Sequence, residues 1–284
     1  MRIGISSSTL DRGGYGRFKD KTYEKLKECG FSATDFGMAN TETFIYTLPE
    51  DEADALLRKE KALAGNAGIE IFQVHGPWRF PPQDFTAEDR AERFDKMERS
   101  IRATSVLGVK NWVIHPLMPF GTSDIKTSDE KGTWDINVEF FGRLIKTAKE
   151  CGVYVCLENM PFPDFSISTP ESIMRLVESV NDENMRVCLD TGHVNVFGLD
   201  IAEEVKRVKD KIQVLHVHDN NYGMDLHRFP YFGTIDWKKF GAALKEIKFS
   251  GVFSLETNPP TSLSDDLFEK TGRLLCETAE SIVK

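Results

Sequence analysis

The sequence predicts an α/β fold in which eight parallel strands close into a barrel inside a ring of helices, a (β/α)8 or TIM barrel. The first observation behind this prediction is the strict alternation of short apolar segments with amphipathic helical segments, which is typical of a parallel sheet. The second is the count, because eight such alternations fit into 284 residues and barrels of this kind need about 250. We therefore expect a single domain over residues 1–284.

The predicted strands are short apolar runs, as expected where both faces of a parallel sheet are covered. The first four are Arg2–Ser6, Ser32–Phe36, Ile69–His75 and Val109–Ile114. The last four are Val153–Leu157, Met185–Leu189, Ile212–Leu215 and Gly251–Leu255. From the third strand onward, each strand ends at or directly before an ionisable side chain: His75, His115, Glu158, Asp190, His216 and Glu256.

The predicted helices follow the strands one by one: Asp20–Cys29, Leu48–Ala67, Thr86–Leu107, Asp135–Glu150, Pro170–Val180, Ile201–Lys209, Trp237–Ile247 and Ser264–Ile282. Thr86 opens a segment that resembles a capping box, and Pro170 occupies the first helical position, where proline is favoured. Glycine follows the first four helices, as is typical of helix C-termini: Gly30, Gly68, Gly108 and Gly152. A long loop over residues 117–133 follows the fourth strand and leaves Trp134 at its exit.

An open, doubly wound sheet is the alternative architecture. Such a sheet usually carries a glycine-rich phosphate-binding turn directly after its first strand. The glycine-rich segment Asp11–Gly16 lies several residues beyond the first strand, so it matches that turn only weakly. The count of strand–helix units therefore favours the closed barrel.

Composition excludes several classes of function. A net charge of −9 and a pI near 5.3 argue against a nucleic-acid binder or a protein that binds anionic membranes. The sequence starts directly with a strand, shows no signal peptide, and has no apolar run near the ~18 residues of a membrane span. The five cysteines are scattered without zinc-like spacing, so we expect reduced thiols in a cytoplasmic protein.

The segment Val187–His193 shows how a site could be built at a strand end. Three apolar residues lead to Asp190, a tight turn follows, and His193 comes three residues later. A helix-capping aspartate and a surface histidine would explain this segment equally well on its own. However, none of the six histidines lies in a predicted helix, and all of them fall at or after strand ends. In a (β/α)8 barrel, this rim is where active sites lie.

Four adjacent strands point an acid or a histidine at the same mouth: Glu158, Asp190, His216 and Glu256. Three carboxylates close together would repel one another, and a divalent cation would relieve that repulsion. Oxygen and imidazole ligands suit Mn²⁺, which we expect first, with Co²⁺, Mg²⁺ or Zn²⁺ as alternatives. Ion pairs with Arg or Lys are the other explanation, but few basic residues lie near these strand ends. His216 is level with the other strand ends, so we expect His218 to contact substrate or support the ligands.

Six ordered motifs resemble the xylose-isomerase-like TIM barrels: Leu157–Asn159, Leu189–His193, His216–Asn220, Asp225–His227, Gly233–Trp237 and Leu255–Asn258. That superfamily contains sugar isomerases, ketose 3-epimerases, hydroxypyruvate isomerases, inosose dehydratases and endonuclease IV. The resemblance covers nearly the whole chain. It implies a metal held by Glu158, Asp190, His216 and Glu256, with the two glutamates as catalytic bases and His193 in contact with substrate.

Endonuclease IV is the main competing relative, because its three-zinc site also uses histidines after strands three and four and a D-x-H pair. The residues at the matching places are His75, His115, Asp225 and His227, which are therefore candidate additional metal ligands. The acidic charge of the chain counts against DNA as a substrate. The predicted rim is instead rich in aromatic residues, which suit the apolar face of a sugar: Trp78, Phe80, Phe85, Phe120, Trp134, Phe162, Phe165 and Tyr231.

We therefore expect a metal-dependent sugar isomerase or epimerase that transfers a proton through a metal-stabilised enediolate. The expected substrate-binding residues are His193, His75, His115, His218, His227 and Trp78. A sugar or cyclitol lyase or dehydratase, a zinc phosphodiesterase and a non-catalytic sugar-binding barrel are the alternatives. The expected partner is a small carbohydrate, with neither nucleic acid nor membrane, and the aromatic loops could also serve a homo-oligomer.

Overall fold

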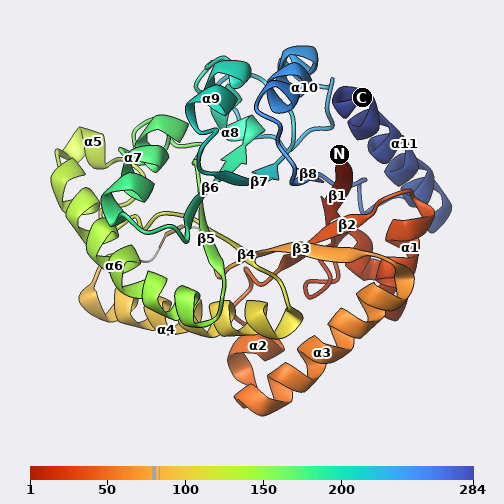
Figure 1. Ribbon diagram of the computed structural model, residues 1–284, viewed down its shortest axis with the longest axis horizontal. Helices are drawn as coiled ribbons and strands as arrows, with labels where there is room; N and C mark the ends of the chain where they lie inside the picture. Colours follow the sequence, from red (N-terminus) through yellow and green to blue (C-terminus); the bar gives the residue numbers. More distant parts are fainter. Residues whose placement is uncertain (79–80, 83) are drawn as a thin grey trace.

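The computed structural model describes residues 1–78, 81–82 and 84–284 and shows the predicted barrel, with eight strands at the centre of a ring of helices (Figure 1). All the strand pairs are parallel, in the order β7-β6-β5-β4-β3-β2-β1-β8. The strands are β1 (Arg2–Ser6), β2 (Ala33–Gly37), β3 (Glu70–His75), β4 (Asn111–Ile114), β5 (Tyr154–Glu158), β6 (Met185–Asp190), β7 (Ile212–His216) and β8 (Val252–Leu255).

The barrel closes between β7 and β8 at the carboxyl ends of these strands. The backbone N–H of Val217 donates to the carbonyl oxygen of Ser254 at 2.8 Å, and the N–H of Glu256 donates to that of Val217 at 2.9 Å. This contact directly follows His216, and Glu256 itself takes part in it. Two predicted site residues are therefore fixed by the closure of the barrel.

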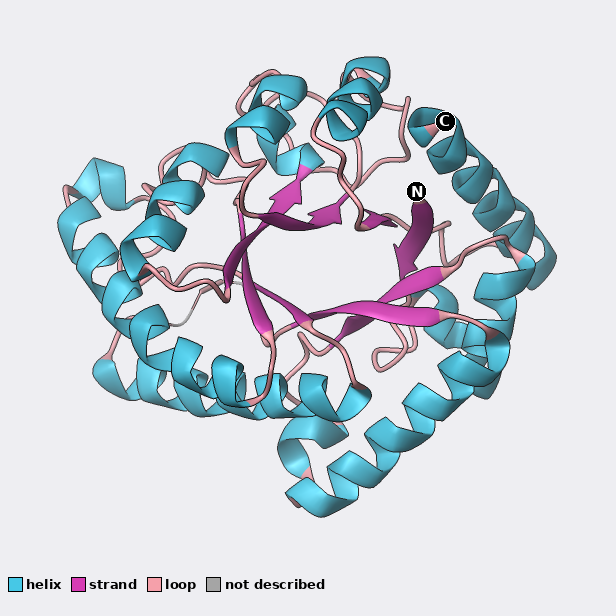
Figure 2. Cartoon of the chain, viewed as in Figure 1, coloured by secondary structure: helices cyan, strands magenta, loops and turns pink. Residues whose placement is uncertain are grey.

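Helices form the outer ring in Figure 2. Those described are the 3-10 helix η1 (Gly14–Lys21), α1 (Thr22–Glu28), α2 (Phe44–Thr47), α3 (Glu50–Ala67), α4 (Ala87–Leu107), α5 (Asp124–Thr127), α6 (Glu130–Glu150), α7 (Pro170–Val180), α8 (Thr191–Val196), α9 (Ile201–Arg207), α10 (Trp237–Glu246) and α11 (Asp265–Val283). Thr86 forms the predicted capping box with Asp89, and Gly68 and Gly108 adopt the left-handed backbone that ends α3 and α4. In the described part of the chain, no helix is both long and apolar enough to cross a membrane.

The structure differs from the sequence-based predictions in three places. The helix expected at Asp135 already begins at Glu130, so Trp134 lies within α6 and not at a loop exit. Short helices η1, α2 and α5 interrupt segments expected as loops. The expectation that no histidine lies in a helix is wrong for His193, which is part of α8. The side chain of Asp190 accepts a hydrogen bond from the N–H of His193 at 2.6 Å, so it also caps this helix.

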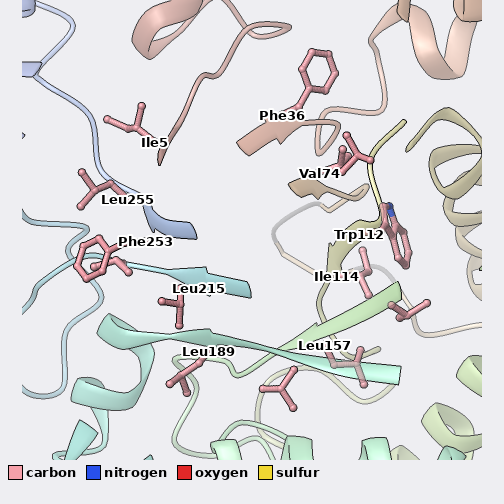
Figure 3. Packing of buried hydrophobic residues seen from close by; sticks show 14 of the residues in the cluster. Ile5, Phe36, Val74, Trp112, Ile114, Leu157, Leu189, Leu215, Phe253 and Leu255 are labelled. Carbon is pink, nitrogen blue, oxygen red and sulfur yellow. The ribbon is translucent and has the colours of Figure 1, made fainter. Parts of the chain in front are cut away.

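Strand residues alternate between the helical ring and the barrel interior. The residues facing the helices form the large apolar core, of which Figure 3 shows Phe36, Val74, Leu157, Leu189 and Leu215. Below the mouth of the barrel, the interior is filled by a separate small cluster, which we call the apolar plug: Val113, Cys156, Cys188 and Val214. The next inward position on each of these four strands is two residues further along, at the mouth of the barrel.

Candidate active site

The inward positions above the apolar plug carry the predicted ligands. Cys156 is followed two residues later by Glu158, Cys188 by Asp190, and Val214 by His216. One ligand atom from each of Glu158, Asp190, His216 and Glu256 lies within 4.8 Å of the others. Glu158, Asp190 and His216 are almost fully buried, whereas the Glu256 side chain keeps 25% of its surface exposed. The structure thus brings the four predicted metal ligands into one cluster.

This cluster has the chemistry of a divalent-cation site. Nδ1 of His216 lies 2.9 Å from Oε1 of Glu158 and 3.4 Å from Oε2 of Glu256. Oε2 of Glu158 and Oε2 of Glu256 are buried without a hydrogen-bond partner. Among the described residues, the ion-pair partners of these carboxylates are all histidines. Three carboxylates and an imidazole with orphaned oxygen atoms fit a hard or borderline divalent ion. Ion pairs with Arg or Lys, the alternative explanation, are not seen for these carboxylates among the described residues.

The surroundings of Glu158 and Glu256 shift the pKa values of the two carboxyl groups in opposite directions. Burial raises the pKa of Glu158, but the histidines His216, His115 and His75 outweigh it and hold that pKa well below its usual value. Burial and the negative charge of Glu158 raise the pKa of Glu256 above its usual value, although His216 and His227 oppose the rise. Two carboxyl groups with opposite shifts in one pocket are typical of a base paired with an acid.

Two further groups of ligand-type side chains flank the central cluster. The first contains His75, His115 and Glu158. Nε2 of His115 lies 3.2 Å from both Nε2 of His75 and Oε2 of Glu158. Burial, partly offset by Glu158, lowers the pKa of His115 to about 4, so this ring is neutral and able to coordinate a metal.

The second flanking group contains His193, His218, Asp225 and His227. Oδ2 of Asp225 lies 3.5 Å from Nε2 of His193 and 3.4 Å from Nε2 of His227. Asp225 of the D-x-H pair therefore lies close to both His193 and His227. His218 differs from the others because it is fully buried, stacks on His227 at 4.0 Å and lies 3.1 Å from Oδ2 of Asp190, behind the pocket wall.

A cavity of about 450 Å³ opens above these groups. Its ionisable lining includes Asp11, Asp35, His75, His115, Glu158, His193, Asp225, His227 and Glu256, and its apolar wall includes Trp78, Met160 and Phe162. The ring of Trp78 makes an edge contact with His115 at 4.9 Å. A cavity of this size, lined by ionisable and aromatic side chains, suits a small polyhydroxylated molecule.

The aromatic rim predicted from sequence is only partly realised. Trp78 and Phe162 line the cavity, whereas Phe85, Phe120 and Tyr231 are exposed outside it. Trp134 lies under the guanidinium group of Arg175, and Phe165 is buried in the core. Phe80 lies outside the described residues. The structure thus assigns two of the expected aromatic residues to the pocket wall.

Sequence reasoning missed three parts of the pocket. Asp35 on β2, together with Ser6 and Ser8 at the end of β1, contributes to the lining. Asp11 comes from the glycine-rich segment that was considered only as a phosphate-binding turn. The signal for Asp35 was an acid within a predicted strand, one position before the strand end.

Comparison with known proteins identifies the relatives of this chain. Residues 23–274 match the model of the xylose isomerase-like TIM barrel family. An uncharacterised protein of Methanocaldococcus jannaschii is 32% identical over 90% of this chain and 83% of its own length. D-psicose 3-epimerase of Ruminiclostridium cellulolyticum is 28% identical over 82% of this chain and 76% of its own length.

A solved structure of the IOLI protein with a bound zinc atom superposes with a TM-score of 0.73 at 22% identity, covering 100% of this chain and 98% of the other. At that identity, the superposition supports the fold alone. Inosose isomerase of Bacillus subtilis is 31% identical over 54% of this chain and 56% of its own length. The relatives that are named as an epimerase or an isomerase support an enzyme of the isomerase class. The chain belongs to the xylose isomerase-like TIM barrel family.

Proposed function

We propose that this protein is a sugar isomerase or epimerase that depends on a divalent metal, with Mn²⁺ as the first candidate. The observation that carries the proposal is the pair Glu158 and Glu256, which both line the cavity and both belong to the four-residue ligand cluster. Relatives named D-psicose 3-epimerase and inosose isomerase support carbohydrate as the substrate class. A cytoplasmic location and self-association stay predictions of the sequence.

Glu158, Asp190, His216 and Glu256 would hold the metal, which would supply Lewis-acid polarisation of a substrate carbonyl. Glu158, with its lowered pKa, is ionised and available to accept the proton on the carbon next to that carbonyl. Glu256 would return a proton to the substrate. Donation to the same carbon from the other face gives an epimer, and donation to the neighbouring carbon gives an isomer.

The rest of the pocket would orient the sugar. His193 lines the cavity, and its Nδ1 lies 2.7 Å from the backbone carbonyl oxygen of Asn159, which fixes the ring. Its other ring nitrogen is thereby left to face the cavity with Asp225. The aromatic faces of Trp78 and Phe162 would pack against the apolar side of the substrate and exclude water.

The experiment that tests this proposal is an assay of the Mn²⁺-loaded protein with a panel of free ketohexoses and inosose, read out by chromatography. We expect interconversion of at least one pair of epimers or isomers and its loss after chelation. Matched assays with Glu158→Gln and Glu256→Gln should show no turnover. Turnover that survives both substitutions would remove the two glutamates from the mechanism.

A zinc phosphodiesterase is the second candidate, because three ligand groups share or adjoin Glu158. The nine side chains that the resemblance to endonuclease IV implies all lie at this mouth: His75, His115, Glu158, Asp190, His193, His216, Asp225, His227 and Glu256. Metal analysis of protein loaded with Zn²⁺ separates the two proposals. One ion per chain with no cleavage of abasic-site DNA supports the isomerase, and three ions with cleavage supports the phosphodiesterase.

A further inference from the structure

Asp35 joins the metal cluster from the opposite side of the barrel. Its Oδ2 lies 3.0 Å from Nε2 of His216, although β1 and β8 separate β2 from β7 around the closed barrel. The pairing of β2 with β3 shifts register between Thr34 and Asp35. The extra residue of this irregularity, Phe72, lies on β3, directly before Gln73; such irregularities re-aim side chains next to sites. The side chain of Asp35 lies inside the barrel, with 3% of the residue exposed.

Gln73 fixes the carboxylate of Asp35 relative to the strand that carries His216. The side-chain amide of Gln73 donates to Oδ2 of Asp35 at 2.9 Å and also reaches the backbone carbonyl oxygen of Leu215 at 3.4 Å. Leu215 directly precedes His216 on β7. Gln73 is itself fully buried, so its amide is held in one place. The amide thus links β3, β2 and β7 under the metal cluster.

The two nitrogen atoms of the His216 ring face different partners. Nδ1 faces Glu158 and Glu256, at 2.9 and 3.4 Å, and therefore points into the ligand cluster. Nε2 lies 3.0 Å from Oδ2 of Asp35. A ring nitrogen that binds a metal must carry no proton, so the proton of a coordinating His216 belongs on Nε2, where a carboxylate can accept it.

We propose that Asp35, held by Gln73, is a positioning residue that sets the tautomer and the orientation of His216 and so raises the affinity of the site for its metal. This inference rests on the metal site of the proposed function and adds a residue to it. A buried carboxylate without a cation is costly, and the only ion pair recorded for Asp35 within the described chain is with His216. Its position is therefore explained by the histidine and not by a separate ion-pair network.

The test compares metal affinities, measured by competition with a chelator, for the wild type, Asp35→Asn and Gln73→Leu. Asp35→Asn should raise the Kd for Mn²⁺ about 10- to 100-fold, as is typical for loss of such a partner, and Gln73→Leu should raise it less. Asp124→Asn is the matched control, because Asp124 is equally buried but bonds to Ser166 outside the cavity lining. Its Kd should match that of the wild type.

A second measurement needs no variant. In wild-type protein loaded with Zn²⁺, long-range ¹H–¹⁵N correlation of the His216 ring should show a proton on Nε2 and metal on Nδ1. The opposite tautomer, or a Kd for Asp35→Asn within twofold of the wild type in a folded variant, would overturn the inference. A wild type that binds no divalent metal would instead overturn the proposed function itself, so the two failures are distinguishable.

Discussion

His216 and Glu158 meet above the interior of the barrel, with Nδ1 of the histidine 2.9 Å from Oε1 of the glutamate. Their strands, β7 and β5, are not neighbours, since β6 lies between them. Both side chains occupy the inward position two residues above the small apolar plug. The contact therefore depends on the inward curvature of the sheet across β5, β6 and β7. It brings the proposed base close to a proposed metal ligand.

Substitution of either glutamate should strongly lower turnover, because each substitution removes one of the two proposed proton-transfer groups. Glu158→Gln removes the carboxylate with the lowered pKa, and Glu256→Gln removes the carboxyl group with the raised pKa. We expect kcat to fall about 10²- to 10⁴-fold in each variant, the usual range for a general acid or base. Glu204→Gln is the control, because this buried glutamate lies on α9 and pairs with Arg207; its kcat should stay close to that of the wild type.

Removal of the metal should destabilise the protein. A metal at 100 times its Kd stabilises the folded state by about 2.7 kcal/mol, which corresponds to roughly 5–10 °C in Tm for a chain of this size. Differential scanning fluorimetry with EDTA and with added Mn²⁺ measures the shift. The shift should shrink in Glu256→Gln, and an equal shift in that variant would show that the ion binds elsewhere.

Trp78 should govern substrate binding more than turnover. Its ring lines the cavity beside His115, and loss of an aromatic contact with a ligand costs about 0.5–1.5 kcal/mol. Steady-state kinetics of Trp78→Ala should therefore show a KM raised roughly 2- to 10-fold. Phe85→Ala provides the contrast, because Phe85 was predicted for the same rim but is 54% exposed outside the cavity. Equal effects from the two substitutions would contradict this assignment of the wall.

The metal-free protein should lose stability in alkaline solution. Burial opposes protonation of His193, but Asp190 and Asp225 outweigh it and raise the pKa of His193 from 6.5 to about 9. For the same type of reason, with Asp225 as the main partner, the pKa of His227 rises to about 10. Because the folded-state values are raised, this stabilisation is complete below about pH 6.5 and disappears as the pH rises through 9 and 10.

Urea unfolding in EDTA at pH 6.5 and at pH 9.5 measures this loss. His227→Gln should reduce the difference between the two free energies of unfolding, because one of the two shifted groups is gone. A wild-type free energy of unfolding that is the same at both pH values would show that Asp225 does not hold these imidazoles in their charged form.

The ligand cluster was predictable because the strand-end rule and the alternation of side chains are local properties. Cys156 and Glu158 share a face of β5, and an acid at the end of an apolar run is visible in the sequence. The contact of Gln73 with Asp35 was not predictable in this way, since it follows a register shift that leaves Phe72 of β3 between the partners of Thr34 and Asp35. That shift is set by packing between strands and leaves no periodic signal.

The loops, too, were predictable only in part. The short helix α8 was missed because six residues give too little periodicity. Its start depends on Asp190, for which helix capping was considered as the alternative to a ligand role, whereas the structure supports capping beside the cluster. The aromatic residues of the rim were recognised as a group, but composition does not tell which of them turn inward. Phe162 lines the cavity, whereas Phe165, three residues later, is buried in the core.

The most direct test of the account is turnover of the Mn²⁺-loaded protein in D₂O with free ketohexoses such as D-psicose and D-tagatose. The account predicts a product with one deuterium on the carbon next to the carbonyl group, because the proton removed by one glutamate exchanges with solvent before a proton returns. Product formed without deuterium would contradict proton transfer by Glu158 and Glu256. Absence of turnover across ketohexoses and inosose, with the metal bound, would contradict the sugar isomerase itself.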